Sequence, residues 1–442
     1  MLLCQTRVIL VRNVEGKNKL DFQDIKDIGI LSFGTFGLGF IFPAYSCSVP
    51  RILLNAGFSK TSTIFLINFE LLFLIFLNPI SEYVLNLTRS AIGRRTPYII
   101  TFGVLTSFML ALLQNINQER SGIGLILVIL VILVNFCLYF YSLSLFGLIK
   151  DKSEQTDQTN QIILRLQTRL WSFIGTFFSL LYCGKSTHTV NSLLPGAGLV
   201  LLISSLLVAF FIVEDKKYKV KISPLEKGEY SFSYDALKTL KNLKQNSTRG
   251  NILTSLILGF FYYLDILIIP FVESKNLGFV IGVHLLASHL VGVSIGYLIK
   301  LFLQRGTSVE WKKSYDYFFL CLNALLYLFL YVSISFDYTI TSYFLLFLIG
   351  TGWGFFLSSR ICILLPGKAE RTILYASDDK EKVMLISFWT IIISIILGVV
   401  TDIFGVNALF FIAIAMTILE LIGIALSDKA KRDIDSAEKG SG

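Results

Sequence analysis

The chain has 442 residues, of which 54% are hydrophobic, 14% aromatic and only 16% charged. A soluble domain carries about 25% charged residues, so this composition excludes an ordinary soluble globular protein. The net charge of +9 is compatible with nucleic-acid binding. The Lys and Arg residues, however, follow the sidedness expected of a membrane protein. We therefore expect no nucleic-acid partner.

The apolar residues fall in blocks of about twenty, the length that a helix needs to cross the ~30 Å hydrocarbon core of a bilayer. In lipid every backbone N–H and C=O needs an internal partner, so these blocks predict spanning helices. The predicted helices, in chain order, cover residues 28–48, 63–86, 97–115, 122–149, 163–185, 195–213, 251–273, 277–303, 315–335, 341–364, 383–401 and 406–427. The expected fold class is all-α integral membrane, with about twelve transmembrane helices.

The positive charges sort onto alternate sides of these helices. Of the 39 Lys and Arg residues, all but five fall on one side. The five exceptions are Arg51, Lys60, Arg120, Lys185 and Lys275. Loops rich in Lys and Arg stay cytoplasmic. The pattern predicts a multi-pass protein of the cell (plasma) membrane with both termini in the cytoplasm.

A long polar segment divides the predicted helices into two groups of six. The expected organisation is a cytoplasmic N-terminus at 1–27, an N-terminal six-helix bundle at 28–213, a cytoplasmic basic linker at 214–250, a C-terminal six-helix bundle at 251–427 and a cytoplasmic tail at 428–442. Anionic lipid headgroups attract basic segments of this kind, so membrane lipid is an expected partner.

The most specific segment joins the second and third predicted helices, and it reads NPISEYVLNLTRSAIGRRTPY over residues 78–98. Gly93 permits a tight turn between antiparallel helices, and Pro97 suits the first turn of the third helix. This segment resembles the signature loop of the major facilitator superfamily. More narrowly, it is similar to that of the glycoside–pentoside–hexuronide:cation symporters and the sucrose:proton symporters. The matching residues are Pro79, Asn86, Thr88, Arg89, Ser90, Gly93, Arg94, Pro97 and Tyr98.

The resemblance implies a secondary transporter with two six-helix bundles that work by alternating access. It implies a small polar solute as substrate, with a sugar or glycoside as the narrower expectation, a monomer, and no cofactor. The coupling carboxylates of sodium-linked members are replaced here by Leu74 and Asn78. We therefore expect a proton rather than sodium as the coupling ion.

The loop also predicts a conformational latch. Guanidinium groups bind carbonyls or carboxylates of an opposing bundle well, and such a contact stabilises one access state. Glu82 lies one turn before the family's acidic position, which is Asn86 here. The alternative is that the arginines only set topology. The predicted latch residues are Glu82, Asn86, Arg89, Gly93, Arg94 and Arg95.

Two acids lie deep within predicted spans, Glu70 in the second helix and Asp265 in the seventh. A charged group at the bilayer centre costs at least ~2.5–3.5 kcal/mol, so each such acid requires a physical reason. One interpretation is a proton-coupling carboxylate. The other is a protonated acid that bonds a neighbouring helix.

Other residues are candidates for the lining of a substrate cavity. Aromatic rings stack on sugar faces, and the resemblance places an arginine near a sugar site. The same residues also fit core packing or, for the arginine, a position at the membrane interface. The cavity candidates are Arg169, Tyr262, Tyr263, Trp353, Trp389 and His289.

Transport has one principal competitor, a protein of the same fold that acts as a receptor, sensor or scaffold without moving solute. A drug, a lipid or an organic anion is an alternative cargo. The sequence contains no nucleophile elbow and no phosphate-binding loop, and its three histidines have no metal-ligand spacing. We expect neither an enzyme with catalytic residues nor a metal site.

Overall fold

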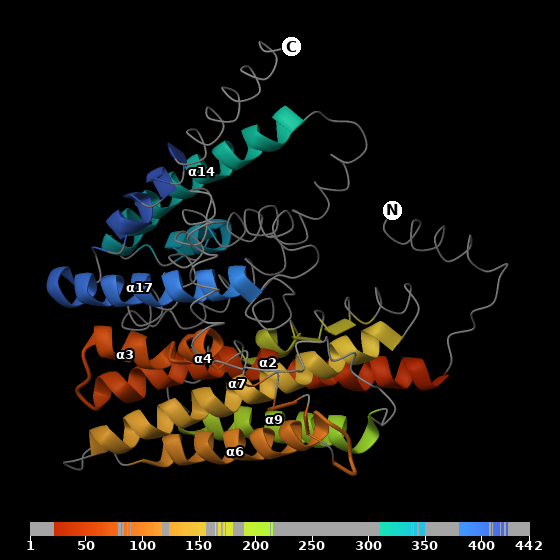
Figure 1. Cartoon of the computed structure of the whole chain (residues 1–442). Helices are drawn as coiled ribbons and strands as arrows, with labels where there is room; N and C mark the ends of the chain where they lie inside the picture. The colour runs from red at the N-terminus through yellow and green to blue at the C-terminus, as the bar shows by residue number, and fades with distance from the viewer. Residues whose placement is uncertain are drawn as a thin grey trace, which may run out of the picture.

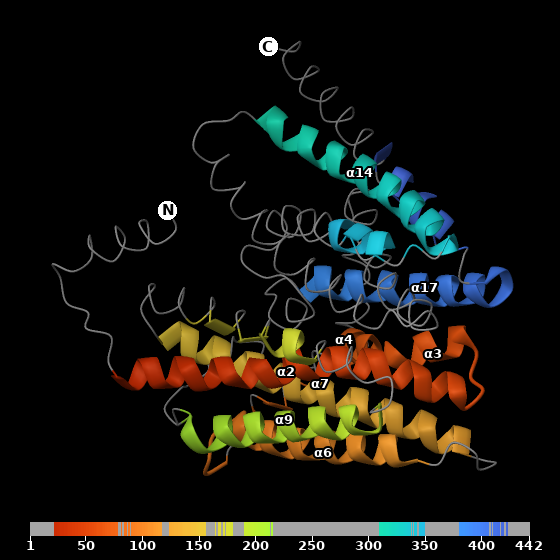
Figure 2. The same cartoon turned by 180° about the vertical axis from the view of Figure 1, so that it is seen from behind.

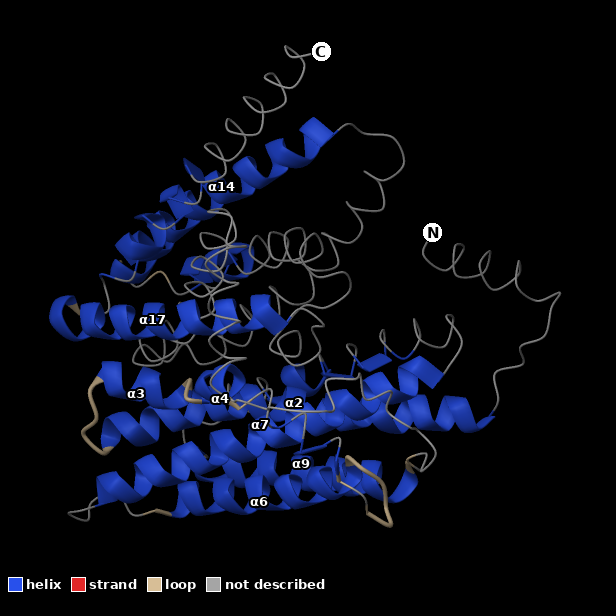
Figure 3. Ribbon diagram, viewed as in Figure 1, coloured by secondary structure: helices blue, strands red, loops and turns tan. Residues whose placement is uncertain are grey.

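In the computed structural model the described residues are 22–77, 90–116, 123–155, 190–212, 309–336 and 380–405, with shorter runs and single positions at 81–88, 164–179, 214, 338–349 and 408–422. Their regular structure is helical (Figure 3). The helices are α2 (Phe22–Asn55), α3 (Lys60–Ile67), α4 (Glu70–Phe76), α6 (Thr96–Asn115), α7 (Ile123–Gln155), α9 (Val190–Phe211), α14 (Val309–Ser335) and α17 (Lys380–Phe404).

Most of these helices coincide with predicted ones, and five of the described segments are long and apolar enough to cross a membrane. These segments are Lys26–Asn55, Thr96–Asn115, Ile123–Ser153, Leu193–Phe211 and Ser387–Phe404. The predicted helices at 251–273 and 277–303 lie outside the described residues. The division of the chain into two bundles joined by a linker stays a prediction.

Two predicted helices have different limits in the structure. The first was expected at 28–48 but continues to Asn55, through Pro43 and Pro50. Proline is tolerated in spanning helices because neighbouring groups bond the carbonyls that it frees. The second was expected as one helix over 63–86, whereas the structure breaks it into α3 and α4. This break positions the candidate site described below.

The helices run lengthwise beside one another in the N-terminal half, and their ends define two poles (Figures 1 and 2). We call the pole where α2 ends and α3 begins the Lys60 end. The opposite pole, where α6 begins and α7 ends, is the Arg95 end. Since α17 contacts both α3 and α4, it joins the C-terminal half of the chain to the N-terminal half.

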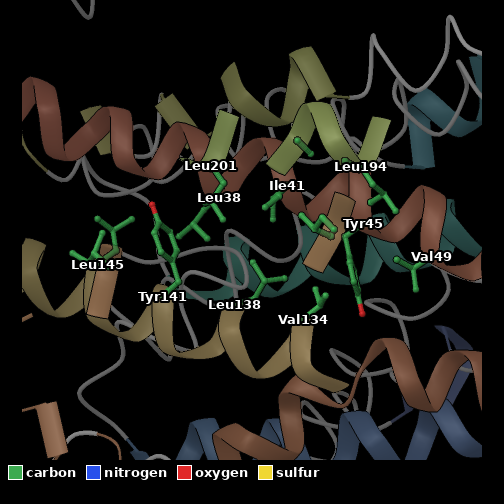
Figure 4. Packing of buried hydrophobic residues seen from close by; sticks show 14 of the residues in the cluster. Leu38, Ile41, Tyr45, Val49, Val134, Leu138, Tyr141, Leu145, Leu194 and Leu201 are labelled. Atoms are coloured by element: carbon green, nitrogen blue, oxygen red, sulfur yellow. The ribbon is translucent and has the colours of Figure 1, made fainter. Parts of the chain in front are cut away.

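One buried cluster holds α2, α7 and α9 together, and Figure 4 shows it from close by. Fully buried members include Leu38 and Ile41 of α2, Leu138 of α7 and Leu201 of α9. A second cluster contains residues of both halves, with Leu74 of α4 beside residues of α14 and α17. The two halves of the chain therefore share apolar packing along α4 and α17.

Apolar side chains also cover the outside of the bundle, as expected for a surface in contact with lipid. On α9, Leu201 is fully buried whereas Leu199 is 57% exposed. Lipid tails are as apolar as leucine, so the exposed leucine loses little by truncation. The buried leucine loses packing contacts that lipid cannot replace.

This difference gives a test of the packing. Leu201→Ala is expected to lower the free energy of unfolding by about 2 kcal/mol, the low end for a buried leucine, because only packing is lost and no transfer from water is involved. The matched variant Leu199→Ala is expected to change it by less than about 0.5 kcal/mol. Denaturant unfolding in detergent micelles measures both. Equal effects would contradict the assigned faces of α9.

Candidate functional site

The second transmembrane segment is interrupted at Asn68 and Phe69, between α3 and α4. Here the backbone hydrogen bonds change from the four-residue spacing of an α-helix to a spacing of three residues. The N–H of Phe69 donates to the carbonyl of Leu66 at 3.3 Å, and the N–H of Leu71 donates to that of Asn68 at 3.0 Å. The Asn68 amide donates back to the Ile64 carbonyl at 2.8 Å. An interruption of this kind inside a membrane needs side-chain donors and acceptors to satisfy the altered backbone.

Asn135 of α7 supplies one of these partners. Its Nδ2 donates to the carbonyl of Leu66 at 2.9 Å, and the side chain is fully buried. Its Oδ1 has no hydrogen-bond partner among the residues that the structure describes. A buried amide oxygen without a partner is costly, and it is therefore available to a ligand, a water molecule or a proton donor.

The interruption lies well inside the predicted second span. It starts eight residues after Lys60, where α3 begins, and a helix rises ~1.5 Å per residue. It is therefore roughly 12–15 Å from the start of α3, a distance of about half the thickness of a ~30 Å hydrocarbon core. Backbone interruptions at this depth occur where protein or a water-filled cavity surrounds them, and in transporters they accompany binding sites.

Glu70 is the first residue of α4, directly after the interruption, and its side chain is buried at 5% exposure. A carboxylate in the first turn of a helix interacts favourably with the positive end of the helix dipole. The structure therefore places this predicted coupling acid at the interruption, in the first turn of a helix that packs on α17.

Trp389 of α17 lies at the same level as Glu70. The Thr61 backbone meets α17 at Gly398, and α17 runs in the opposite direction to α3 and α4. Nine residues inward from Thr61 lead to Glu70, and nine residues inward from Gly398 lead to Trp389. The indole Nε1 is buried and has no acceptor within the described part of the chain. Two of the predicted site residues thus lie at one level on two helices that contact each other.

A separate group of charges lies at the Arg95 end. Asp151, near the end of α7, accepts from Arg94 Nη2 at 2.5 Å and from Arg95 Nε at 2.7 Å. All three side chains are 11–14% exposed. We call these three residues with Glu214 the charged cluster. Two guanidinium groups balance two carboxylates, which makes their burial tolerable.

Glu214 completes the N-terminus of α6. Its Oε2 accepts from the backbone N–H of Arg95 at 2.8 Å and of Thr96 at 3.3 Å. Arg95 is the N-cap residue of α6 and has no side-chain bond of its own to the helix. Gly93 has a φ of 122°, and a Cβ there would lie 2.6 Å from Glu214 Cβ. Glycine at this position therefore permits the positive φ of the turn and also leaves room for the Glu214 side chain.

The charged cluster belongs to the N-terminal half. Asp151 on α7 and Glu214 just after α9 bind these arginines within this half, whereas the sequence predicted a contact with the opposite bundle. Within this half the contacts fix the loop against α6, α7 and α9. A latch across the two halves stays a prediction, since the side chains of Glu82, Asn86 and Arg89 lie outside the described residues.

Several other predicted site residues cannot be placed. The coupling candidate Asp265 lies outside the described residues, as do five of the cavity candidates. These five are Arg169, Tyr262, Tyr263, Trp353 and His289. Sequence reasoning missed Asn135, Asp151 and Glu214. Asn135 is a lone amide in an apolar block, which is a signal that was present in the sequence.

Solved structures with a similar fold cover nearly the whole chain. The nucleoside transporter NupG matches with a TM-score of 0.62 at 14% identity, covering 92% of this chain and 98% of that one. The POT family transporter PepTSo matches with a TM-score of 0.60 at 11% identity, covering 94% and 99%. The xylose transporter XylE from E. coli matches with a TM-score of 0.58 at 12% identity, covering 90% and 98%. No protein-family model matches the chain, and no curated protein matches it.

These matches show that the chain shares the fold of these three transporters, which confirms the all-α, multi-pass architecture predicted from the sequence. The structures that it resembles are transporters rather than enzymes. The narrower resemblance to sugar:cation symporters stays a prediction.

The charged cluster is testable by a double-mutant cycle. Asp151→Asn and Arg95→Gln are each expected to destabilise the protein, because each removes one charge from the balanced, partly buried cluster. Their combined effect should be smaller than the sum by about 1.5–3 kcal/mol, the contribution of a hydrogen bond between charged groups. The measurement is unfolding in micelles. Additivity within ~0.5 kcal/mol would show that the two residues do not interact.

The role of Asn135 is testable in the same assay. Asn135→Ala is expected to reduce the free energy of unfolding by about 1–3 kcal/mol, because the Leu66 carbonyl loses a buried donor. Asn115→Ala is the matched control, since that exposed amide only bonds the Ala111 carbonyl of its own helix. Equal losses in the two variants would remove the structural role given to Asn135.

Proposed function

We propose that the chain is a secondary active transporter that moves a small polar solute across the membrane by alternating access. The observation that carries this proposal is the polar interruption at mid-membrane depth in a chain with the major facilitator fold. A nucleoside transporter, a peptide transporter and a xylose transporter share the fold, and these names all denote polar cargo. A sugar or glycoside is the narrower proposal, supported by the signature loop at residues 78–98.

The proposed coupling ion is a proton, and the proposed carrier is Glu70. Glu70 is buried in a helix that packs on α17, and a buried carboxyl group is stable when it is neutral or bonded to a donor. When the halves part, water reaches the group and stabilises its charged form. Protonation of Glu70 is thereby linked to whether α4 packs against α17. Asp265 stays a second candidate for the same role.

The charged cluster supports the proposed orientation. Its two arginines belong to the side of the chain that carries nearly all positive charge, so the Arg95 end is proposed to face the cytoplasm and the Lys60 end the exterior. The solute would reach the polar interruption from either side in turn. We propose a monomer in the plasma membrane, without a cofactor.

The test is uptake into proteoliposomes with an imposed inward proton or sodium gradient, using labelled pentoses, hexoses, disaccharides, nucleosides and dipeptides. One solute class is expected to accumulate under the proton gradient. Glu70→Gln is expected to lower this accumulation at least tenfold while keeping gradient-free exchange, because the amide cannot carry a proton.

The matched control is Asp27→Asn, a carboxyl-to-amide change at the Arg95 end, where Asp27 pairs with Lys152 at 3.2 Å. Accumulation should persist in this variant. Sodium-driven accumulation would contradict proton coupling. No flux of any solute, with correctly folded and oriented protein, would favour the receptor, sensor or scaffold function over transport.

A further inference from the structure

The first turn of α3 is completed by a residue from the other half of the chain. The first N–H groups of a helix have no partner within the helix. Ser59, the N-cap, accepts from the N–H of Ser62 at 3.1 Å through its hydroxyl. The N–H groups of Lys60 and Thr61 instead donate to the carboxylate of Asp402 on α17, each at 3.1 Å.

Further bonds surround this carboxylate. The hydroxyl of Thr61 donates to Asp402 Oδ2 at 2.6 Å, and Lys60 Nζ donates to the carbonyl of Thr401 at 3.3 Å. The acid thus receives three bonds from the start of α3. A carboxylate at a helix N-terminus also interacts favourably with the helix dipole, and charge-assisted bonds are stronger than neutral ones.

The backbones of α3 and α17 meet at the same place. A Cβ added to Gly398 would lie 2.6 Å from Thr61 Cα, which no side chain tolerates without a shift of the helix. Only glycine at this position allows the two helices to approach so closely. This packing is independent of the hydrogen bonds, and both observations place the two halves in direct contact at the Lys60 end.

We propose that Asp402 and Gly398 form a closure of the Lys60 end, made when the two halves meet there and broken when they part. Asp402 acts as a cap supplied by one half to the other. Gly398 lets the halves come close enough for the cap to reach. The closure goes beyond the proposed transport, because its state is measurable without any solute.

The contact between Asp402 and the start of α3 is weak enough for the closure to open. Asp402, Lys60 and Thr61 lie at an exposed rim, so water reaches the N–H groups and the carboxylate once they separate. A helix cap of this kind changes an equilibrium by roughly five- to thirty-fold. The charged cluster at the Arg95 end differs, since its described bonds stay within one half and do not need to break.

The test measures the distance between spin labels across the Lys60 end by double electron–electron resonance. Labels are attached to cysteines at Asn55 and Phe404, which are exposed, in a full-length chain whose native cysteines are replaced by serine. The labelled protein with native Asp402 and Gly398 is expected to give mainly the short distance. Asp402→Ala is expected to lower the ratio of short to long distances about five- to thirty-fold.

Two further variants make the result specific. Asp402→Asn keeps the shape and one acceptor oxygen, so an intermediate ratio is expected. Gly398→Val removes the close approach and should also favour the long distance, with Asp402 unchanged. Asp27→Asn, a change at the other end, should leave the ratio as it is.

The proposal is overturned if the distance distribution is the same with Asp402 or alanine at this position, in proteins with equal melting temperatures. It is equally overturned if Asp27→Asn opens the Lys60 end as much as Asp402→Ala does. If Gly398→Val does not fold, the proposal is decided by the distances measured in Asp402→Ala and Asp402→Asn. Absence of solute flux in proteoliposomes would contradict the proposed transport and leave the closure intact, so the two failures are distinguishable.

Discussion

Backbone groups that lack a helical partner must be satisfied inside an apolar surrounding, and this constraint explains where the polar residues of the protein lie. The carbonyl of Leu66 at the helix interruption accepts from the Phe69 N–H at 3.3 Å and also from Asn135. The first N–H groups of α6 bind Glu214, and those of α3 bind Asp402. In each case a helix end or break takes a partner from a distant part of the sequence. The same bonds that satisfy the backbone therefore also hold the helices in their places.

The contacts of Asn135, Glu214 and Asp402 differ in whether they lie within one half of the chain or between the two halves. Asn135 and Glu214 bind within the N-terminal half, so they make that half a unit with a polar interruption at its centre. Asp402 binds between the halves. A fold whose halves move against each other needs firm bonds inside each half and weaker, hydrated bonds between them. The described contacts follow this division.

Much of the architecture was predictable from the sequence because it depends on the length and polarity of apolar blocks. The limits of α6 and α7 near the predicted 97–115 and 122–149 illustrate this. The interruption of the second helix was not predictable, since Asn68 and Phe69 contain no glycine or proline to mark it. The partners Asp151, Glu214 and Asp402 are ordinary acids near helix ends in the sequence. Only the packing of α7, α9 and α17 brings them to their arginine and amide partners.

The candidate site shows the same limit. Glu70 was predicted from its charge in an apolar block, and the structure confirms that it is buried. That it follows an interruption and lies level with Trp389 depends on the pairing of α4 with α17. A single sequence carries no signal for that pairing.

The length of α7 has a consequence for the kind of membrane that the protein tolerates. At 33 residues it is roughly 50 Å long, well beyond a ~30 Å hydrocarbon core. Its C-terminal end carries Asp151 and Lys152, which form ion pairs with Arg94, Arg95 and Asp27. A thicker, sterol-rich bilayer is then accommodated by a change in tilt rather than by drawing these charges into lipid. A helix of this length can therefore span bilayers of differing thickness.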